Sequence, residues 1–302
     1  MLIENLIKEF LYDCQVRELS PLTVSNYSKQ LSYFLNFLES INITKLEELK
    51  PAHIKQYIGS IQERGCKPSY INDLLKAVKV MCSYAYNEGY TKEVITKRVK
   101  NVKQPKVLIH TFSESEIKRM INYFNGKDYL SMRNKLILML FFDTGIRCAE
   151  LINMKLSQIQ SNYFIIYGKG RKERVVPKSA IISKYLMKYL AVRERYFLWK
   201  DIDDYVFLSK NGKPLTEEAI CKFMRDAGKA VNVNPLVRLS PHTCRHTFAH
   251  QQLKNGLDLY SLSRLLGHES VTITQRYLES IHNIEVLQSA KQTGVLFNLI
   301  IK

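Results

Sequence analysis

Cysteine and long apolar runs are both scarce in this chain of 302 residues. Its six cysteines form no CxxC pair and no spacing typical of a disulfide framework, which favours a reducing compartment. The most apolar run, Leu136 to Phe142, is too short to cross a bilayer, and the charged N-terminus lacks the pattern of a signal peptide. We therefore expect a cytoplasmic protein with no membrane partner.

Acidic residues are also in short supply. The chain carries 28 Asp and Glu against 45 Lys and Arg, a net charge of +17. Residues 1–100 hold 14 basic and 11 acidic residues, a balance of +3, so residues 101–302 hold 31 and 17, a balance of +14. Charge concentrated in this way indicates a polyanionic partner, most simply nucleic acid, although a solvated basic surface would give the same composition.

No internal repeat or low-complexity segment is present, and the length together with 46% apolar residues predicts about two folded domains. Residues 1–90 are predicted to form a helical bundle. Apolar residues recur there at helical spacing after three helix-start signals, Ser20-Pro21, Pro51 and Pro68. Residues 91–110 are basic and lack apolar periodicity, which is typical of an interdomain linker or of an ordinary exposed loop.

The second predicted domain covers residues 111–302. It opens with a capping box at Ser113 to Glu116 and continues with a strongly apolar helix over 130–142. Two short strands are expected at 163–167 and 174–177, joined by a Gly-rich basic turn. The predicted fold class is therefore mainly α with a small antiparallel β-sheet. Further helices are expected at about 179–198, 216–231, 241–255, 258–266 and 270–280.

Two basic segments lie near the start of this domain. Arg147 follows Gly145 at a turn that should lead into a helix, and Glu150 lies one turn on, where it could orient the guanidinium. A surface Arg–Glu pair would have the same spacing. Lys169 lies in the turn between the two strands, where an ammonium could protonate a departing oxygen, but the spacing does not distinguish it from Lys172.

A third segment places His242 and Arg245 on one face at the start of a helix, directly after Pro241. The free N–H groups of a helix N-terminus favour an anion there. His246 and His250 continue the histidines at helical spacing, but the sequence has no HExxH motif and no carboxylate among them, so we expect no metal site.

The fourth segment contains His268, which follows a helix stop at Gly267, and Tyr277. Because the chain has 18 tyrosines, Tyr277 is a candidate nucleophile only through its position after the other segments. A phenol with a pKa of about 10 needs positive neighbours or a base to attack phosphate. Attack on a phosphodiester without a metal ion needs arginines that bind the phosphate, a histidine that transfers a proton and a nucleophile such as a phenol. The four segments together supply these groups.

In their order and spacing, these segments resemble the motifs of the tyrosine recombinases of the phage-integrase and Xer type. The resemblance covers nearly the whole length. The first 90 or so residues resemble the helical core-binding domain of that family, and the chain from about residue 111 resembles its catalytic domain. The motifs that carry the resemblance are Thr-Gly-Ile-Arg147 with Glu150, Gly-Lys169-Gly-x-Lys-Glu-Arg, His242-x-x-Arg245, Leu-Leu-Gly-His268 and Tyr277.

The resemblance implies a role for each residue. Arg147 and Arg245 would hold the non-bridging oxygens of the scissile phosphate, and His268 would hydrogen-bond the phosphoryl group. His242 would accept the proton of Tyr277, which would form the 3′-phosphotyrosyl bond.

It also implies that Lys169, rather than Lys172, is the general acid for the 5′-hydroxyl leaving group. The expected activity is then site-specific cleavage and rejoining of double-stranded DNA with no ATP, metal or other cofactor. Strand exchange between two duplexes implies four protomers on paired sites, and accessory DNA-bending proteins are a further class of partner. The apolar C-terminal tail, within 286–301, could dock on its own domain or on a neighbouring protomer.

Three other functions use part of the same pattern. A tyrosine-type topoisomerase would use the same residues on a single duplex. A DNA-binding regulator without catalytic activity would explain the net positive charge. It would not explain why every expected catalytic position holds a residue suited to catalysis. A metal-dependent nuclease would need a cluster of carboxylates, which the sequence does not contain.

Overall fold

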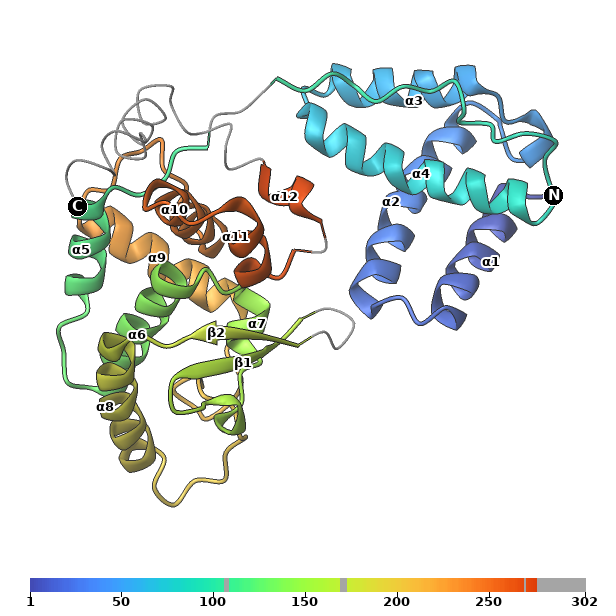
Figure 1. Ribbon diagram of the computed structural model, residues 1–302. Coiled ribbons are helices and arrows are strands. Elements are labelled where there is room, and N and C mark those ends of the chain that lie inside the picture. The colour runs from blue at the N-terminus through green and yellow to red at the C-terminus, as the bar shows by residue number, and fades with distance from the viewer. Residues whose placement is uncertain (106–108, 169–172, 269, 276–302) are drawn as a thin grey trace, which may run out of the picture. The chain divides into compact units, whose positions relative to one another are not determined.

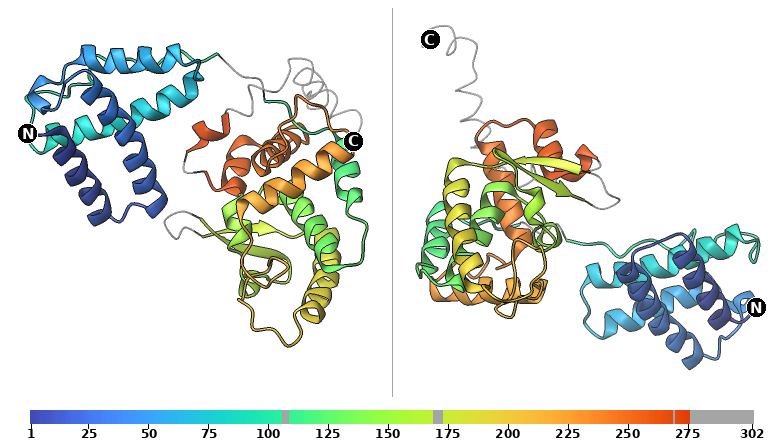
Figure 2. Two further views of the ribbon diagram at one scale, coloured as in Figure 1. Left: turned by 180° about the vertical axis from the view of Figure 1, so that it is seen from behind. Right: turned by 90° about the horizontal axis from the view of Figure 1, so that it is seen from below.

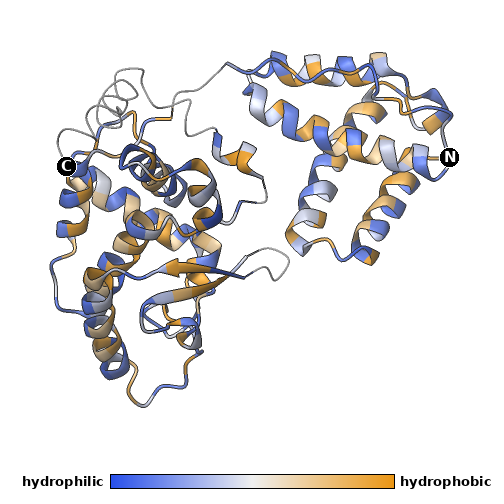
Figure 3. Ribbon diagram, in the orientation of Figure 1, coloured by the Kyte–Doolittle hydropathy of each residue, from blue (hydrophilic) through white to orange (hydrophobic). Residues whose placement is uncertain are grey.

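The computed structural model describes residues 1–105, 109–168, 173–268 and 270–275. The chain divides into two compact units, Met1–Val107 and Leu108–Lys302 (Figures 1 and 2). Hydrophobic and hydrophilic residues interleave along the helices of both units (Figure 3), and the apolar ones gather in a separate core within each unit. None of the helices in the described ranges is both long enough and apolar enough to span a membrane.

Helices are the only regular secondary structure in the described residues of the first unit, as its sequence predicts. Ser20 caps the second helix by accepting a hydrogen bond from the Thr23 amide. Three helices of this unit begin with a proline, at Pro21, Pro51 and Pro68. The buried face of each helix packs into one core, in which the ring of Phe10 contacts that of Tyr27. The helices are α1 (Ile3–Val16), α2 (Pro21–Ser40), the short 3-10 helix η1 (Leu46–Glu48), α3 (Pro51–Glu63) and α4 (Pro68–Asn87).

Most of the predicted linker packs on this first unit. The Asn72 side chain of α4 donates to the carbonyl of Val102 (2.9 Å) and accepts from its amide (2.8 Å). Val99 is buried in the core of the helices. These contacts give hydrogen-bond partners to the backbone of an irregular segment and attach it to the helices. The first unit therefore extends past residue 90, which is where the sequence predicts its end.

The second unit is mainly helical with one small sheet in its described part, which confirms the predicted fold class. The Ser113–Glu116 capping box is present at its first helix. Its helices are α5 (Glu114–Tyr123), α6 (Tyr129–Thr144), α7 (Cys148–Ile152), the 3-10 helix η2 (Leu156–Gln158), α8 (Ala180–Tyr196), α9 (Glu217–Ala230), α10 (Pro241–Lys254), α11 (Leu259–Leu266) and α12 (Val271–Gln275).

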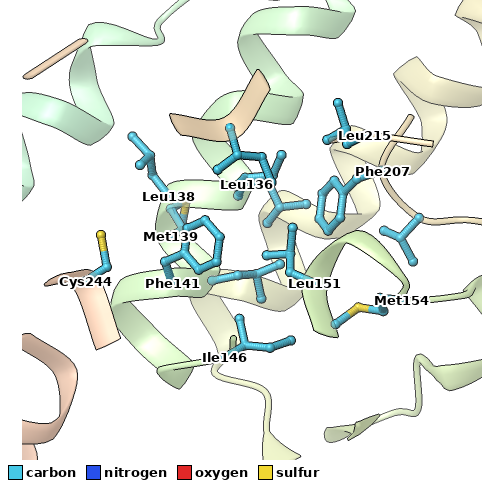
Figure 4. Packing of buried hydrophobic residues seen from close by; sticks show 14 of the residues in the cluster. Leu136, Leu138, Met139, Phe141, Ile146, Leu151, Met154, Phe207, Leu215 and Cys244 are labelled. Carbon is cyan, nitrogen blue, oxygen red and sulfur yellow. The ribbon is translucent and has the colours of Figure 1, made fainter. Parts of the chain in front are cut away.

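Helix α6 forms the centre of this unit. It packs against α5, α8 and α10 and is buried along most of its length, as its apolar sequence predicts. Figure 4 shows Leu136 and Phe141 of α6 packed among Leu151 and Phe207 from other segments. A helix buried on several sides gives its C-terminal end a fixed position, and the first basic segment begins there.

The sheet is an antiparallel hairpin of β1 (Tyr163–Tyr167) and β2 (Glu173–Pro177), which lie side by side in Figure 1. Phe164 pairs with Val176, and both side chains are buried on one face. Tyr163, Tyr167 and Val175 alternate with them and are exposed on the other face. The turn that contains Lys169 lies outside the described residues.

Candidate active site

Arg147 lies at the junction between α6 and α7. Gly145 ends α6 in the left-handed conformation, and Arg147 is the residue that precedes α7. The Glu150 carboxylate accepts hydrogen bonds from the Arg147 amide (2.9 Å) and from its Nη1 (2.8 Å). The predicted turn, helix and orienting glutamate are therefore all present. The Arg147 side chain remains 41% exposed.

Glycine is required at position 145 for two reasons. Its φ of +60° lies in the left-handed region, and a Cβ atom there would lie 2.5 Å from Cδ1 of Phe248 on α10. The absence of a side chain therefore allows the end of α6 to approach α10 closely, and α10 carries the second arginine.

Arg245 of α10 is buried, with 4% of its surface exposed. Its Nη1 donates to the carbonyl of Gly145 (2.6 Å), and its Nη2 donates to the carbonyl of Leu266 (2.7 Å). The same Nη2 lies 3.0 Å from Nε2 of His268. These bonds fix the guanidinium between the end of α6 and the end of α11.

The neighbours of His268 determine which of its ring nitrogens carries the proton. A guanidinium is only a donor, so Nε2 of His268 accepts from Arg245. The neutral ring then carries its proton on Nδ1, which donates to Oγ1 of Thr274 at 2.8 Å. Thr274 is completely buried on α12, so this bond is protected from water.

Three arginines meet at the C-terminal end of α11. Successive carbonyl groups of this end, those of Leu265, Leu266 and Gly267, each accept a hydrogen bond from a different arginine. The last carbonyls of a helix have no partner within the helix and carry partial negative charge, which favours cations. The donors, in the same order, are Arg174, Arg245 and Arg147.

Glu150 contacts two of these arginines. Besides Arg147, it accepts two bonds from Arg174, one from Nη1 at 2.6 Å and one from Nη2 at 2.7 Å. Burial raises the pKa of this carboxyl, but the paired Arg174 guanidinium and the Arg147 donors outweigh burial and lower the pKa to about 2. Glu150 is therefore ionised at every pH at which the protein would work.

The remaining predicted residues stand as follows. His242 is exposed in the first turn of α10, one turn before Arg245, and its Nε2 lies 3.0 Å from Nε2 of His246. Within the described ranges, no group of three or more His, Cys, Asp or Glu side chains lies close enough to hold a metal ion. Lys169 and Tyr277 lie outside the described residues.

A cleft of about 1700 Å³ opens over this arrangement. Arg147, Glu150, Arg174 and His268 contribute to its lining. The exposed face of the hairpin, with Tyr163, Tyr167 and Val175, and the α11 residues Tyr260 and Arg264 form other parts of the wall. The cleft is therefore basic where the arginines converge and aromatic or apolar along the hairpin.

The sequence placed Arg174 in the basic Gly-rich segment, with no role beyond a general electrostatic one, and gave Thr274 no role. The alternation along β2 could have indicated Arg174, because it shares the inward face with Val176 and so had to find a buried partner. Thr274 had no comparable signal, since its hydrogen bond to His268 depends on how α12 follows α11.

Two family profiles match this chain. The profile of the phage integrase family matches residues 110–283, and that of the phage integrase N-terminal SAM-like domain matches residues 7–89. The first match alone covers more than half of the chain. The chain therefore belongs to the phage integrase family and is a tyrosine-type site-specific recombinase.

Among individual relatives, the chain is similar to XerD proteins. It is 30% identical over 279 residues to the tyrosine recombinase XerD of Halalkalibacterium halodurans, covering 91% of this chain and 93% of that protein. The identity to XerD of Staphylococcus saprophyticus is 28% over 278 residues, covering 91% and 94% of the two chains.

Solved structures show the same fold. The XerA recombinase is 25% identical, with a TM-score of 0.53 over 96% of this chain and 98% of that one. XerH bound to its difH substrate after cleavage gives a TM-score of 0.74 at 19% identity, over 91% and 80% of the two chains. A lambda integrase tetramer bound to a Holliday junction gives 0.72 at 16% identity, over 92% and 77%.

Proposed function

We propose that this recombinase cleaves and rejoins duplex DNA at specific sites through a covalent bond between Tyr277 and a 3′ phosphate. The observation that carries the proposal is the convergence of Arg147 and Arg245 on adjacent carbonyls at the end of α11, with Nε2 of His268 lying 3.0 Å from Nη2 of Arg245. Two guanidinium groups within such a small space match the oxygens of a single phosphate, and the His268 ring orients the Arg245 fork.

The reaction is a transesterification. The phenolic oxygen of Tyr277 attacks the phosphorus while its proton passes to His242, and the bond from phosphorus to the 5′ oxygen breaks. Lys169 supplies the proton that the departing 5′ oxygen takes up. The phosphodiester is exchanged for a phosphotyrosyl ester of similar free energy, so the reverse reaction rejoins a strand without ATP or a metal ion.

Arg147 and Arg245 stabilise the extra negative charge that develops on the phosphoryl oxygens in the transition state. The hydrogen bonds to Gly145, Leu266 and Gly267 hold both guanidinium groups before DNA arrives. Preorganised donors of this kind cost no reorganisation during the reaction, which is why they contribute strongly to rate.

We propose duplex DNA as the partner and four protomers on two paired sites as the working assembly. The excess of 17 positive charges supports a polyanionic partner. XerH and lambda integrase, which have the same fold, were solved on DNA, the latter as a tetramer on a Holliday junction. Action on DNA in a reducing cytoplasm fits six cysteines without framework spacing, and accessory DNA-bending proteins would assist the pairing of sites.

Replacement of the nucleophile tests the proposal. Tyr277→Phe should bind a nicked suicide substrate but form no protein–DNA species that survives SDS, since phenylalanine has no hydroxyl to attack phosphorus. Tyr123→Phe, at an exposed tyrosine of α5, is the matched control and should keep the adduct. An SDS-resistant adduct with Tyr277→Phe would show that another residue is the nucleophile.

The same clamp would suit a topoisomerase, so the assay must separate the two reactions. Recombination needs two sites, whereas a topoisomerase relaxes a supercoiled plasmid that has no second site. We expect products only from plasmids that carry paired sites.

Truncation after about Ser289 tests where the C-terminal tail docks. Loss of DNA-dependent oligomers with folding intact would place its docking surface on a neighbouring protomer.

A further inference from the structure

We propose that Arg174 is a positioning residue that shares the Glu150 carboxylate with Arg147, so that the three side chains together keep a net positive charge beside the phosphate. The inference rests on the proposed role of Arg147 in the phosphate clamp. It concerns a residue of β2 whose side chain shares the inward face of the hairpin with Val176 and also contributes to the lining of the cleft.

The contacts of Arg174 use all three nitrogens of its guanidinium. Nη1 and Nη2 form a bidentate pair with Glu150, and Nε donates to the carbonyl of Leu265. The side chain is only 10% exposed, and Glu150 is 6% exposed, so water screens this pair weakly. A bidentate pair of this kind fixes both partners, and lysine cannot reproduce it.

The same side chain also fixes the turn that precedes His268. A Cβ atom on Gly267 would lie 2.8 Å from Cδ of Arg174, so this glycine packs directly on the arginine stem. The carbonyl of Gly267 is the one that accepts from Nη2 of Arg147. Arg174 therefore supports Arg147 from two directions, through Glu150 and through the end of α11.

The charges of Arg147, Glu150 and Arg174 determine how strongly this cluster attracts a phosphate. Arg147 and Glu150 alone would form a neutral pair, and a neutral pair would offer little attraction to a phosphate. With Arg174 the cluster has two guanidinium groups and one carboxylate, a net charge of +1. Because Arg147 is the more exposed of the two arginines, the excess positive charge faces the cleft at that residue.

The test compares two substrates that differ only at the scissile phosphate. One is the ordinary phosphodiester, and the other is a neutral methylphosphonate, which lacks the charge that the cluster would balance. Arg174→Gln should slow formation of the covalent adduct about 10- to 100-fold on the phosphodiester, the range expected when a supporting partner is removed. The loss on the methylphosphonate should be much smaller.

Two further variants separate charge from folding. Glu150→Gln combined with Arg174→Gln restores the net charge of +1, so the double variant should cleave the phosphodiester faster than Arg174→Gln alone. Arg174→Lys keeps the charge but loses the fork, so its rate should be intermediate. Arg195→Gln, at an exposed arginine of α8, is the control for loss of one positive charge and should match the wild type on both substrates.

The outcomes distinguish this inference from the proposed function. Equal losses on both substrates, or a double variant no faster than Arg174→Gln, would overturn the role in charge balance, and thermal melting would identify a folding defect. If Arg147→Gln is impaired on the phosphodiester while Arg174→Gln is not, only the inference fails. If Arg147→Gln itself cleaves like the wild type, the phosphate clamp fails.

Discussion

Arg147, which precedes α7, and Arg245 of α10 hydrogen-bond to adjacent carbonyl groups at the C-terminal end of α11, those of Gly267 and Leu266. No local pattern in the sequence predicts either hydrogen bond. The end of one short helix thus sets the distance between the two guanidinium groups that we propose as the phosphate clamp.

Arg245→Lys should form the covalent adduct at least about 10²-fold more slowly than the wild type, the loss typical of removing one preorganised donor. Lysine keeps the positive charge but cannot bond to Gly145 and Leu266 while also reaching His268. Single-turnover cleavage of a suicide substrate measures the effect. Near-wild-type cleavage would remove Arg245 from the clamp.

Thr274→Val should slow cleavage about 10-fold, because it removes the hydroxyl that accepts from Nδ1 of His268 and so loosens the ring and its tautomer. Thr274→Ser is the matched control, since it keeps the hydroxyl and should retain most of the activity. The pH profile of single-turnover cleavage should shift in the valine variant only. Equal behaviour of the two variants would show that the hydroxyl does not act on His268.

Gly145→Ala should lower the free energy of unfolding by roughly 2 to 4 kcal/mol, the sum of left-handed backbone strain and overpacking. The added Cβ would lie 2.5 Å from Phe248. Gly256→Ala is the control, because that glycine has φ +89° but no atom within 4 Å of the added Cβ. It should lose only about 1 kcal/mol. Urea unfolding measures both, and equal losses would exclude the contact with Phe248.

Glu150 should make the stability of the second unit sensitive to acid. Its pKa is lowered from 4.5 to about 2 in the folded protein, so its contribution is fully present above about pH 4.5 and is lost as the pH falls toward 2. The contribution at neutral pH is about 3 kcal/mol for a shift of this size.

Urea unfolding at a series of pH values measures this contribution. The stability difference between the wild type and Glu150→Gln should shrink steadily as the pH is lowered through this window. Glu194→Gln, at an exposed glutamate of α8, should show no such trend. A difference between wild type and Glu150→Gln that stays constant with pH would contradict the predicted role of the ionised carboxylate.

Local signals in the sequence determined most of the secondary structure. Ser20, Ser113 and the helix-initiating prolines predict helix starts because their physical effect involves only neighbouring residues, and the structure has those starts. The end of the first unit was harder to predict, because Val99 is buried in the core and Val102 is held by the Asn72 side chain of α4. The local pattern of a basic segment reveals neither contact.

The sequence by itself determined which chemical groups are present, a series of arginines and histidines in a fixed order before Tyr277, and with it the family. Only the tertiary structure decided that Arg147, Arg174 and Arg245 all bond to the last carbonyls of α11, and that Glu150 serves two of them. The physical reason is that helix periodicity fixes relations within one turn or two. Which separate segments meet depends on how the core around α6 packs, and on a glycine small enough to let α10 approach.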